Sequence, residues 1–152
     1  MARKRITKRK ICQPKLPMQR QLRFGHEGRY FDLKAVFRKV NERYFGSRLR
    51  GYTIVWGRRR KQPPRSYFVF GSIQEDDRII RIHPLLDQRF VPGWFLEYVV
   101  YHEMLHAFVP DEFGPRGRRI VHTAQFKERE KKFRYYRRAR LWETENLARF
   151  LQ

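Results

Sequence analysis

The sequence predicts an α+β domain, in which one helix, three short strands and then further helices follow each other along the chain. Three observations lead to this class. Apolar residues recur at three- and four-residue steps over residues 31–45. Short runs rich in Ile, Val, Tyr and Phe then occupy residues 52–83, and helical patterns return from residue 93 onward. The predicted architecture is a small, mainly antiparallel sheet packed with helices, one of which is buried.

The first helix is predicted over "FDLKAVFRKVNERYF", residues 31–45. Asp32 suits the N-cap, because its short carboxylate can accept hydrogen bonds from the free amides of the first turn. Gly46 suits the end of the helix, because glycine adopts the left-handed conformation without strain. The three strands are predicted over "YTIVWG" (52–57), "SYFVFGS" (66–72) and "RIIRIH" (78–83).

Two prolines organise the segment that follows the strands. Pro84 and Pro92 bracket "LLDQRFV", which predicts a short turn or helix. Proline is also favourable as the first residue of a helix, so we expect Pro92 to begin the helix that contains "EYVVYHEMLHAFVP". The end of the chain, from residue 122, predicts one long helix or two shorter ones.

The charge balance is the most extreme feature of the composition. Thirty-six Lys and Arg residues stand against fifteen Asp and Glu residues, which gives a formal net charge of +21. Such a charge favours polyanionic partners, with nucleic acid first and an anionic membrane surface second. Residues 1–22 are predicted to form a flexible basic N-terminal arm, and residues 23–152 a single folded domain.

Several classes of protein are not expected for this sequence. No apolar run approaches the roughly 18–20 residues of a membrane-spanning helix. No apolar signal region stands near the N-terminus, so we do not expect a secreted protein. Cys12 is the only cysteine, which excludes an internal disulfide framework and a cysteine-ligated zinc ribbon. The expected location is a reducing compartment, either the cytoplasm or the nucleoid or nucleus.

The buried helix carries the pattern H-E-x-x-H, formed by His102, Glu103 and His106. Residues four apart lie on one face of a helix, one turn above the other, so the two imidazoles can share a metal ion. Glu103 points one step around the helix, where it can take a proton from water. A chain of this composition would contain the pattern by chance about 0.01 times, a value that favours a metal site over coincidence.

A catalytic zinc usually takes three protein ligands, so a third ligand is needed. His122 is the predicted one, because it shares a helical stripe with Phe126 and Phe133 and should face inward. Acidic alternatives are chemically acceptable but have competing roles. Solvated ion pairs are expected for Glu128 and Glu130, a solvent-exposed loop for Asp111 and Glu112, and structural or surface roles for His26 and His83.

The flanking sequence resembles the SprT-like zinc metallopeptidases, the family that includes Spartan. The resemblance rests on "VVYHEMLHAF" followed by "HTAQF", with "LKAVFRKVNERYFGSRL", "IVWG" and "IRIHPLLD" upstream and "LWETEN" downstream. It covers roughly residues 29–151, although the chain has no cysteine zinc ribbon after this region. The resemblance implies a zincin-like fold with Zn²⁺ bound by His102, His106 and His122, and with Glu103 as the catalytic base.

The resemblance also implies a zinc metalloendopeptidase that acts on proteins bound or crosslinked to nucleic acid, with DNA favoured over RNA. We expect a monomer. Tyr101 and Tyr67 are candidates for steadying the oxyanion, but core packing is the expected role of each. The basic arm, Arg58–Lys61, Arg116–Arg119 and residues 127–140 are the candidate nucleic-acid contacts. The alternative is a non-catalytic nucleic-acid-binding protein with a structural zinc, which would leave Glu103 without a role.

Overall fold

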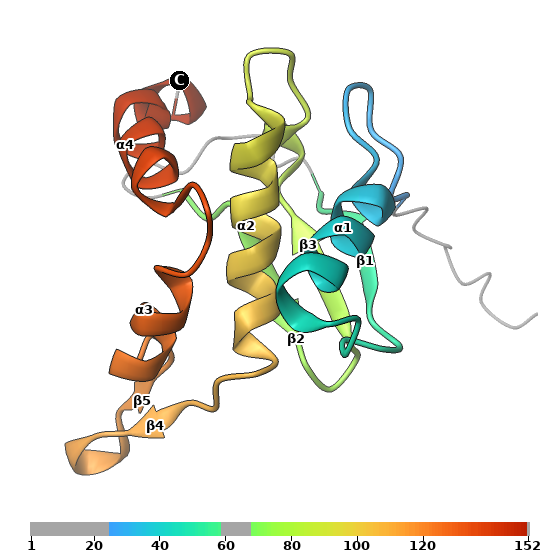
Figure 1. Ribbon diagram of the computed structural model, residues 1–152. Helices are drawn as coiled ribbons and strands as arrows, with labels where there is room; N and C mark the ends of the chain where they lie inside the picture. Colours follow the sequence, from blue (N-terminus) through green and yellow to red (C-terminus); the bar gives the residue numbers. More distant parts are fainter. Residues whose placement is uncertain (1–24, 59–67, 152) are drawn as a thin grey trace, which may run out of the picture.

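A computed structural model describes residues 25–58 and 68–151 (Figure 1). The predicted α+β class is confirmed, since these residues form a small three-stranded sheet and four α-helices. The predicted arm, Tyr67 and the basic residues 59–61 lie outside the described residues. None of the described helices is long and apolar enough to cross a membrane. The helices are α1 (Leu33–Phe45), α2 (Gly93–His106), α3 (Ala124–Glu130) and α4 (Tyr136–Asn146).

The sheet is mixed, so the prediction of a mainly antiparallel sheet was wrong. Its order is β1 (Thr53–Trp56), β3 (Ile79–Ile82), β2 (Gly71–Gln74). β2 and β3 form an antiparallel hairpin, whereas β1 and β3 are parallel. The prediction assumed that consecutive strands pair. Instead, the long connection after β1 carries the chain to the far edge, and β3 then enters between its two predecessors.

The second strand also begins later than predicted, at Gly71 instead of residue 66. The aromatic residues Phe68 and Phe70 precede it and pack against the core. They have the composition of a strand, but β3 provides only four partner positions in the register, from Gly71 opposite Ile82 to Gln74 opposite Ile79. The length of the shared ladder sets where the strand begins.

Both predicted caps of α1 are confirmed. The side chain of Asp32 accepts a hydrogen bond from the amide of Lys34 at 2.9 Å, which satisfies one of the free donors of the first turn. Gly46 adopts the left-handed conformation, with φ of 56°, and its amide bonds to the carbonyl of Asn41. The capped helix packs along α2 and beside β1.

Helix α2 is the centre of the molecule, with α1, α3 and α4 on its sides and the sheet behind it (Figure 1). Apolar residues surround it nearly completely, and Phe95, Leu96, Val100 and Met104 are fully buried. Pro92 is the N-cap and not the first helical residue, one position from the prediction. Because the helix is packed on all sides, its backbone is held rigidly, and the positions of its side chains are fixed with it.

The C-terminal part forms two α-helices, α3 and α4, which is the second of the two predicted arrangements. Residues 131–135 form the turn between α3 and α4. The segment before α3, predicted as a loop, contains a small hairpin instead, in which Glu112 pairs with Ile120 and Phe113 with Arg119. The remaining elements are β4 (Glu112–Phe113), β5 (Arg119–Ile120) and three 3-10 turns, η1 (Pro84–Leu86), η2 (Pro115–Gly117) and η3 (Leu147–Phe150).

Candidate metal centre

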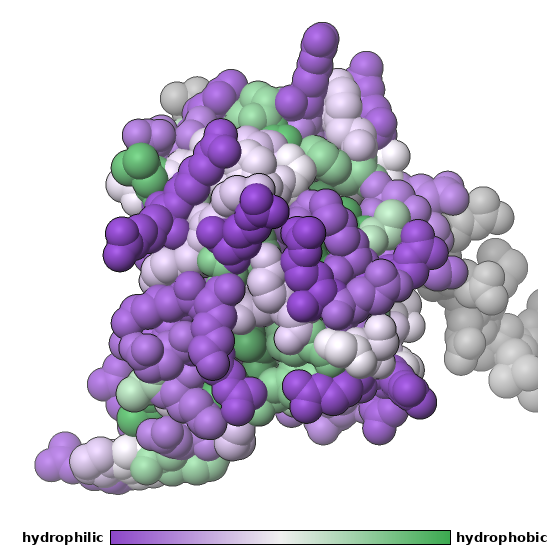
Figure 2. Space-filling model, in the orientation of Figure 1, coloured by the Kyte–Doolittle hydropathy of each residue, from purple (hydrophilic) through white to green (hydrophobic). Residues whose placement is uncertain are grey.

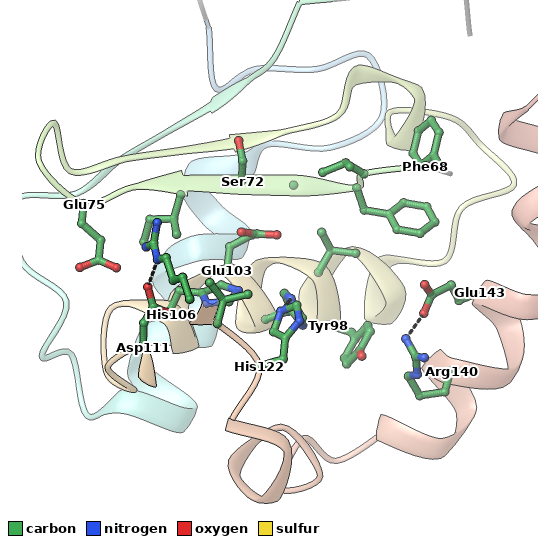
Figure 3. A pocket seen from close by; sticks show the side chains of 18 residues that line it. Phe68, Ser72, Glu75, Tyr98, Glu103, His106, Asp111, His122, Arg140 and Glu143 are labelled. Carbon is green, nitrogen blue, oxygen red and sulfur yellow. Dashed lines mark hydrogen bonds and ion pairs between the residues drawn. The ribbon is translucent and has the colours of Figure 1, made fainter. Parts of the chain in front are cut away.

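Three histidines converge at the C-terminal half of α2 (Figure 3). One ligand nitrogen from each of His102, His106 and His122 lies within 4.8 Å of the other two. The Nε2 atoms of His102 and His122 are 3.2 Å apart. The first two histidines are one helical turn apart on α2, and the third comes from the turn that leads into α3. Among the described residues, no other histidine, cysteine or acidic group forms such a cluster.

His122 is placed by the start of α3. The next residue, Thr123, is the N-cap, and its hydroxyl accepts a hydrogen bond from the amide of Phe126 at 3.1 Å. Phe126 is fully buried and its ring lies 4.5–5.1 Å from the three imidazole rings. Phe126 and Phe133 are buried as predicted, whereas His122 is exposed, although its ring faces the other two histidines across Phe126.

The donor set suits a zinc ion. At a Zn–N distance of about 2.0–2.1 Å, tetrahedral geometry separates two ligand nitrogens by roughly 3.3 Å, close to the 3.2 Å observed between His102 and His122. Three neutral nitrogen donors with an open fourth side are typical of catalytic zinc sites. A structural site would need a fourth protein ligand, and no cluster in residues 25–58 and 68–151 provides one.

Glu130 is not a solvated ion pair, so that prediction was wrong. Glu130 is only 8% exposed, and its Oε1 lies 2.7 Å from Nδ1 of His102. The hydroxyl of Tyr98 donates to the same oxygen at 2.8 Å. With Nδ1 of His102 held in this way, its Nε2 is left to face the other two histidines. Burial alone would raise the pKa of Glu130, but hydrogen bonds from His102 and Tyr98 outweigh it, and the pKa lies below its usual range.

A sequence signal for this role of Glu130 existed. The residue lies four positions after Phe126 and three before Phe133, on the same helical stripe that predicted an inward His122. Its charged neighbours in "KEREKKF" suggested solvent instead. Glu128 does lie in solvent, where it pairs with Lys131 at 2.7 Å, so the expected ion pair is confirmed for that residue.

Glu103 is buried beside the cluster, and no hydrogen bond joins its carboxylate to another described residue. It is 6% exposed, and burial raises the pKa of its carboxyl to about 7, although nearby His102 lowers it in part. Glu103 lines the cavity, and its oxygens are not sealed from solvent: the one fully buried unpaired side-chain polar atom among the described residues is Nε1 of Trp56. Figure 3 shows it on α2, next to β2 and on the same side of the helix as His106.

The close approach of β2 depends on a glycine. A Cβ at position 71 would lie 2.8 Å from Cγ and Oε1 of Glu103, closer than side-chain contacts allow. Gly71 thus lets the first residue of the outer strand lie against the carboxylate. This proximity could not be predicted from the sequence, because the start of β2 was placed elsewhere.

Burial keeps two of the three imidazoles neutral. Burial first, and then the neighbouring His102 and His122, lower the pKa of His106 to about 4. Burial and His102 also lower the pKa of His122. Both shifts favour the uncharged imidazole, which is the form that binds a metal ion.

The histidines and Glu103 open into one cavity of about 480 Å³. Strand β2 and residues 68–70 form one wall, α2 the floor, and the β4–β5 hairpin and α4 the two ends. Arg119 pairs with Asp111 at the hairpin end, and Arg140 pairs with Glu143 at 2.6 Å at the α4 end. Asp111, expected in a solvent-exposed loop, therefore lines the cavity together with Arg119.

The remaining candidates lie away from the cluster or have other partners. His26 bonds to Asp32 at 2.9 Å, and Nδ1 of His83 accepts from the amide of Leu85. Glu112 is exposed on β4. The hydroxyl of Tyr101 donates to the carbonyl of Arg129 at 2.6 Å in the core, so this residue packs and does not face the cavity.

Comparison of the chain with models of protein families, with curated proteins and with solved structures gave no match.

Proposed function

We propose that the protein is a zinc-dependent endopeptidase, as the resemblance to SprT-like metallopeptidases implies. One observation carries the proposal: a buried carboxylate without a partner in the described residues, Glu103, opens into the same cavity as three convergent imidazoles. A structural metal site needs four closed ligands and no such carboxylate. This contrast favours hydrolysis over the alternative of a non-catalytic protein with a structural zinc.

In the proposed reaction, His102, His106 and His122 hold the zinc ion. When bound there, zinc supplies a Lewis acid that polarises a carbonyl and makes water more acidic. Glu103 accepts a proton from the water that attacks the peptide carbonyl. The same carboxyl then returns the proton to the departing amine, which completes the cleavage. A carboxylate held at this position can accept the proton and return it within one reaction cycle.

The wall of the cavity suits an extended peptide. β2 is the outermost strand of the sheet, and among the described residues no strand pairs with its other edge. Free amides and carbonyls on such an edge can bind a peptide backbone as an additional strand. Gly71 brings that edge against Glu103, so a peptide bound there would carry its carbonyl groups past the histidines.

The substrates we propose are proteins bound to nucleic acid, DNA before RNA, in a cytoplasmic, nucleoid or nuclear setting. The support is the net charge of +21 together with the family resemblance. A protein that carries such a charge will accumulate on polyanions, and with them on the proteins that they bind.

The test is hydrolysis of an unfolded protein such as casein by the zinc-loaded chain. Glu103→Gln keeps the shape of the side chain and removes the proton acceptor, so hydrolysis should fall by a factor of 100 or more, in line with the about 10²–10⁴-fold contribution of general acid–base catalysis. Glu128→Gln is the matched control, because it makes the same change at an exposed position. Wild-type hydrolysis by Glu103→Gln with zinc still bound would refute the mechanism.

A further inference from the structure

A basic and aromatic surface lies where the start of α4 meets the start of α2. We call it the α4 basic face and define it by Trp94, Arg134, Tyr135, Arg137 and Arg138. The three arginines are exposed, and the two rings are half-buried with their centroids 6.3 Å apart. In Figure 2, which has the orientation of Figure 1, hydrophilic side chains cover the helices on this side, with small hydrophobic areas between them.

The positive charge of this face is not neutralised within the described part of the chain. No ion pair there involves any of the three arginines, although Arg140, one turn further along α4, pairs with Glu143. Arg134 and Arg138 lie over rings whose centroids are 6.3 Å apart, and two such positive groups repel one another unless an anion lies near them. The face is therefore electrostatically suited to a ligand with several negative charges.

Two of the arginines are held in place by the rings. The guanidinium of Arg138 lies 4.5 Å from the centroid of Trp94, and that of Arg134 lies 5.1 Å from the centroid of Tyr135. A guanidinium stacked on a ring is ordered before a ligand arrives and still directs its N–H groups sideways. Such a group binds phosphate oxygens through two parallel hydrogen bonds.

We propose that the α4 basic face binds the sugar–phosphate backbone of nucleic acid, without reading its bases. The guanidinium groups already cover the rings, so bases do not stack on Trp94 and Tyr135 as they do on exposed aromatic platforms. A membrane surface fits the face less well, because interfacial binding needs apolar side chains that insert, and both rings are half-buried.

The face lies apart from the metal cavity. Trp94 precedes His102 by eight residues, which corresponds to about 12 Å along the axis of α2. Helix α4 connects the two regions, since Arg140 and Glu143 line the cavity whereas Arg137 and Arg138 point to solvent. A nucleic acid on the face leaves the cavity open. Its benefit to the protein rests on the proposed function, because it would hold a nucleic-acid-bound protein near the histidines.

The experiment measures the affinity of the full-length protein for a fluorescent single-stranded oligonucleotide of mixed sequence as a function of salt. Each phosphate contact contributes about 0.7 to the slope of log affinity against log salt. The triple variant Arg134→Gln, Arg137→Gln, Arg138→Gln should therefore reduce the slope by about 2. The control replaces Lys34 and Arg38 on α1 and Arg50 after it by Gln, an equal loss of charge at exposed positions outside the face.

A third variant separates positioning from charge. Arg138→Lys keeps the positive charge but loses the planar group that lies on Trp94, so we expect weaker binding with a nearly unchanged slope. Thermal unfolding of every variant verifies that the fold is retained. Glu103→Gln should bind the oligonucleotide as the wild type does, because the carboxylate lies in the cavity and not on the face.

Binding of each protein to phosphatidylserine vesicles is measured in parallel. Three outcomes would overturn the proposal: a salt slope in the triple variant equal to that of the wild type, an equal loss of slope in the control, or a triple variant that loses affinity for the vesicles but not for the oligonucleotide. The first would show that the three arginines do not contact phosphates, the second that net charge and not this face determines binding, and the third would assign the face to a membrane surface. The proposed peptidase would fail separately, if the zinc-loaded wild type bound the oligonucleotide as expected but hydrolysed no protein.

Discussion

Replacement of Glu130 by Gln should weaken zinc binding although Glu130 is not a ligand. Oε1 of this residue accepts hydrogen bonds from Nδ1 of His102 at 2.7 Å and from the hydroxyl of Tyr98 at 2.8 Å. A carboxylate behind a metal-bound histidine fixes the orientation of the ring and increases its basicity. Gln keeps the shape of the side chain and one acceptor oxygen but removes the negative charge, and neutral hydrogen bonds are roughly half as strong as charged ones.

The magnitude follows from comparable partners of metal ligands. Their loss lowers metal affinity by about 10- to 100-fold, or about 1.4–2.8 kcal/mol of binding free energy. Glu130→Ala would be a poorer test, because it also leaves the buried hydroxyl of Tyr98 without an acceptor. That loss lowers the free energy of unfolding by about 1–3 kcal/mol. Tyr98→Phe removes one hydrogen bond to Glu130 but leaves the bond to His102, so its effect on zinc affinity should be smaller.

The assay is competition for zinc between the protein and a chelator of known affinity, at constant pH. The visible spectrum of the cobalt-substituted protein is the second readout, since a change in the position of His102 alters the ligand field, whereas a loss of stability does not. Glu128→Gln, the same change in an exposed ion pair, is the control. Equal zinc affinity of the Glu130→Gln and Glu128→Gln proteins, with identical cobalt spectra, would refute the role of Glu130.

Three further predictions concern the same site. The purified protein should bind about one zinc per chain, and elemental analysis should show a marked loss in His122→Ala but not in His26→Ala, whose imidazole bonds to Asp32 far from the cluster. Gly71→Ala should reduce protein hydrolysis while zinc binding is retained, because the new Cβ would lie 2.8 Å from Cγ of Glu103 and displace it; unchanged kinetics would contradict this. The contribution of His106 to the stability of the zinc-free protein should be lost as the pH falls from about 6.5 toward 4, since its pKa is lowered to about 4 and the unfolded chain takes up a proton before the folded one does. The raised pKa of Glu103 acts in the opposite direction, so the comparison with a His106 variant isolates this contribution. Thermal unfolding at several pH values measures this loss, which should be reduced in His106→Gln.

The features that the sequence predicts best are those fixed within one helix. The spacing of His102 and His106 determines their common face as soon as the segment is helical, and the caps at Asp32 and Gly46 act on adjacent residues. The position of His122 follows from the same rule, because Phe126 anchors the first turn of α3. In each case the interaction lies within one helical turn of the residue that predicts it.

Contacts between distant segments were less predictable. The parallel pairing of β1 with β3 depends on where a long connection returns, and no local pattern encodes that. The partnership of Glu130 with His102 joins residues 28 positions apart. Neighbouring Lys and Arg residues made Glu130 look solvent-exposed, whereas its helical phase places it inside. For a buried charged residue, the position on the helical face was the better predictor of burial. A partner can neutralise a buried charge, whereas the helix geometry fixes the direction in which the side chain points.

The polar groups of α2 differ in how the fold accommodates them, and the difference supports the catalytic role proposed for one of them. Nδ1 of His102 bonds to the buried carboxylate of Glu130, and burial lowers the pKa of His106, which favours its neutral form. Glu103 is the exception, since it is buried and no residue in the described part of the chain donates to it. A fold that needed only stability would place an apolar residue there, as it does at Val99, one turn earlier and also lining the cavity. An unpartnered carboxylate persists at such a position when a ligand or reacting group supplies the missing contact, and under the proposed function that group is the water beside the three imidazoles.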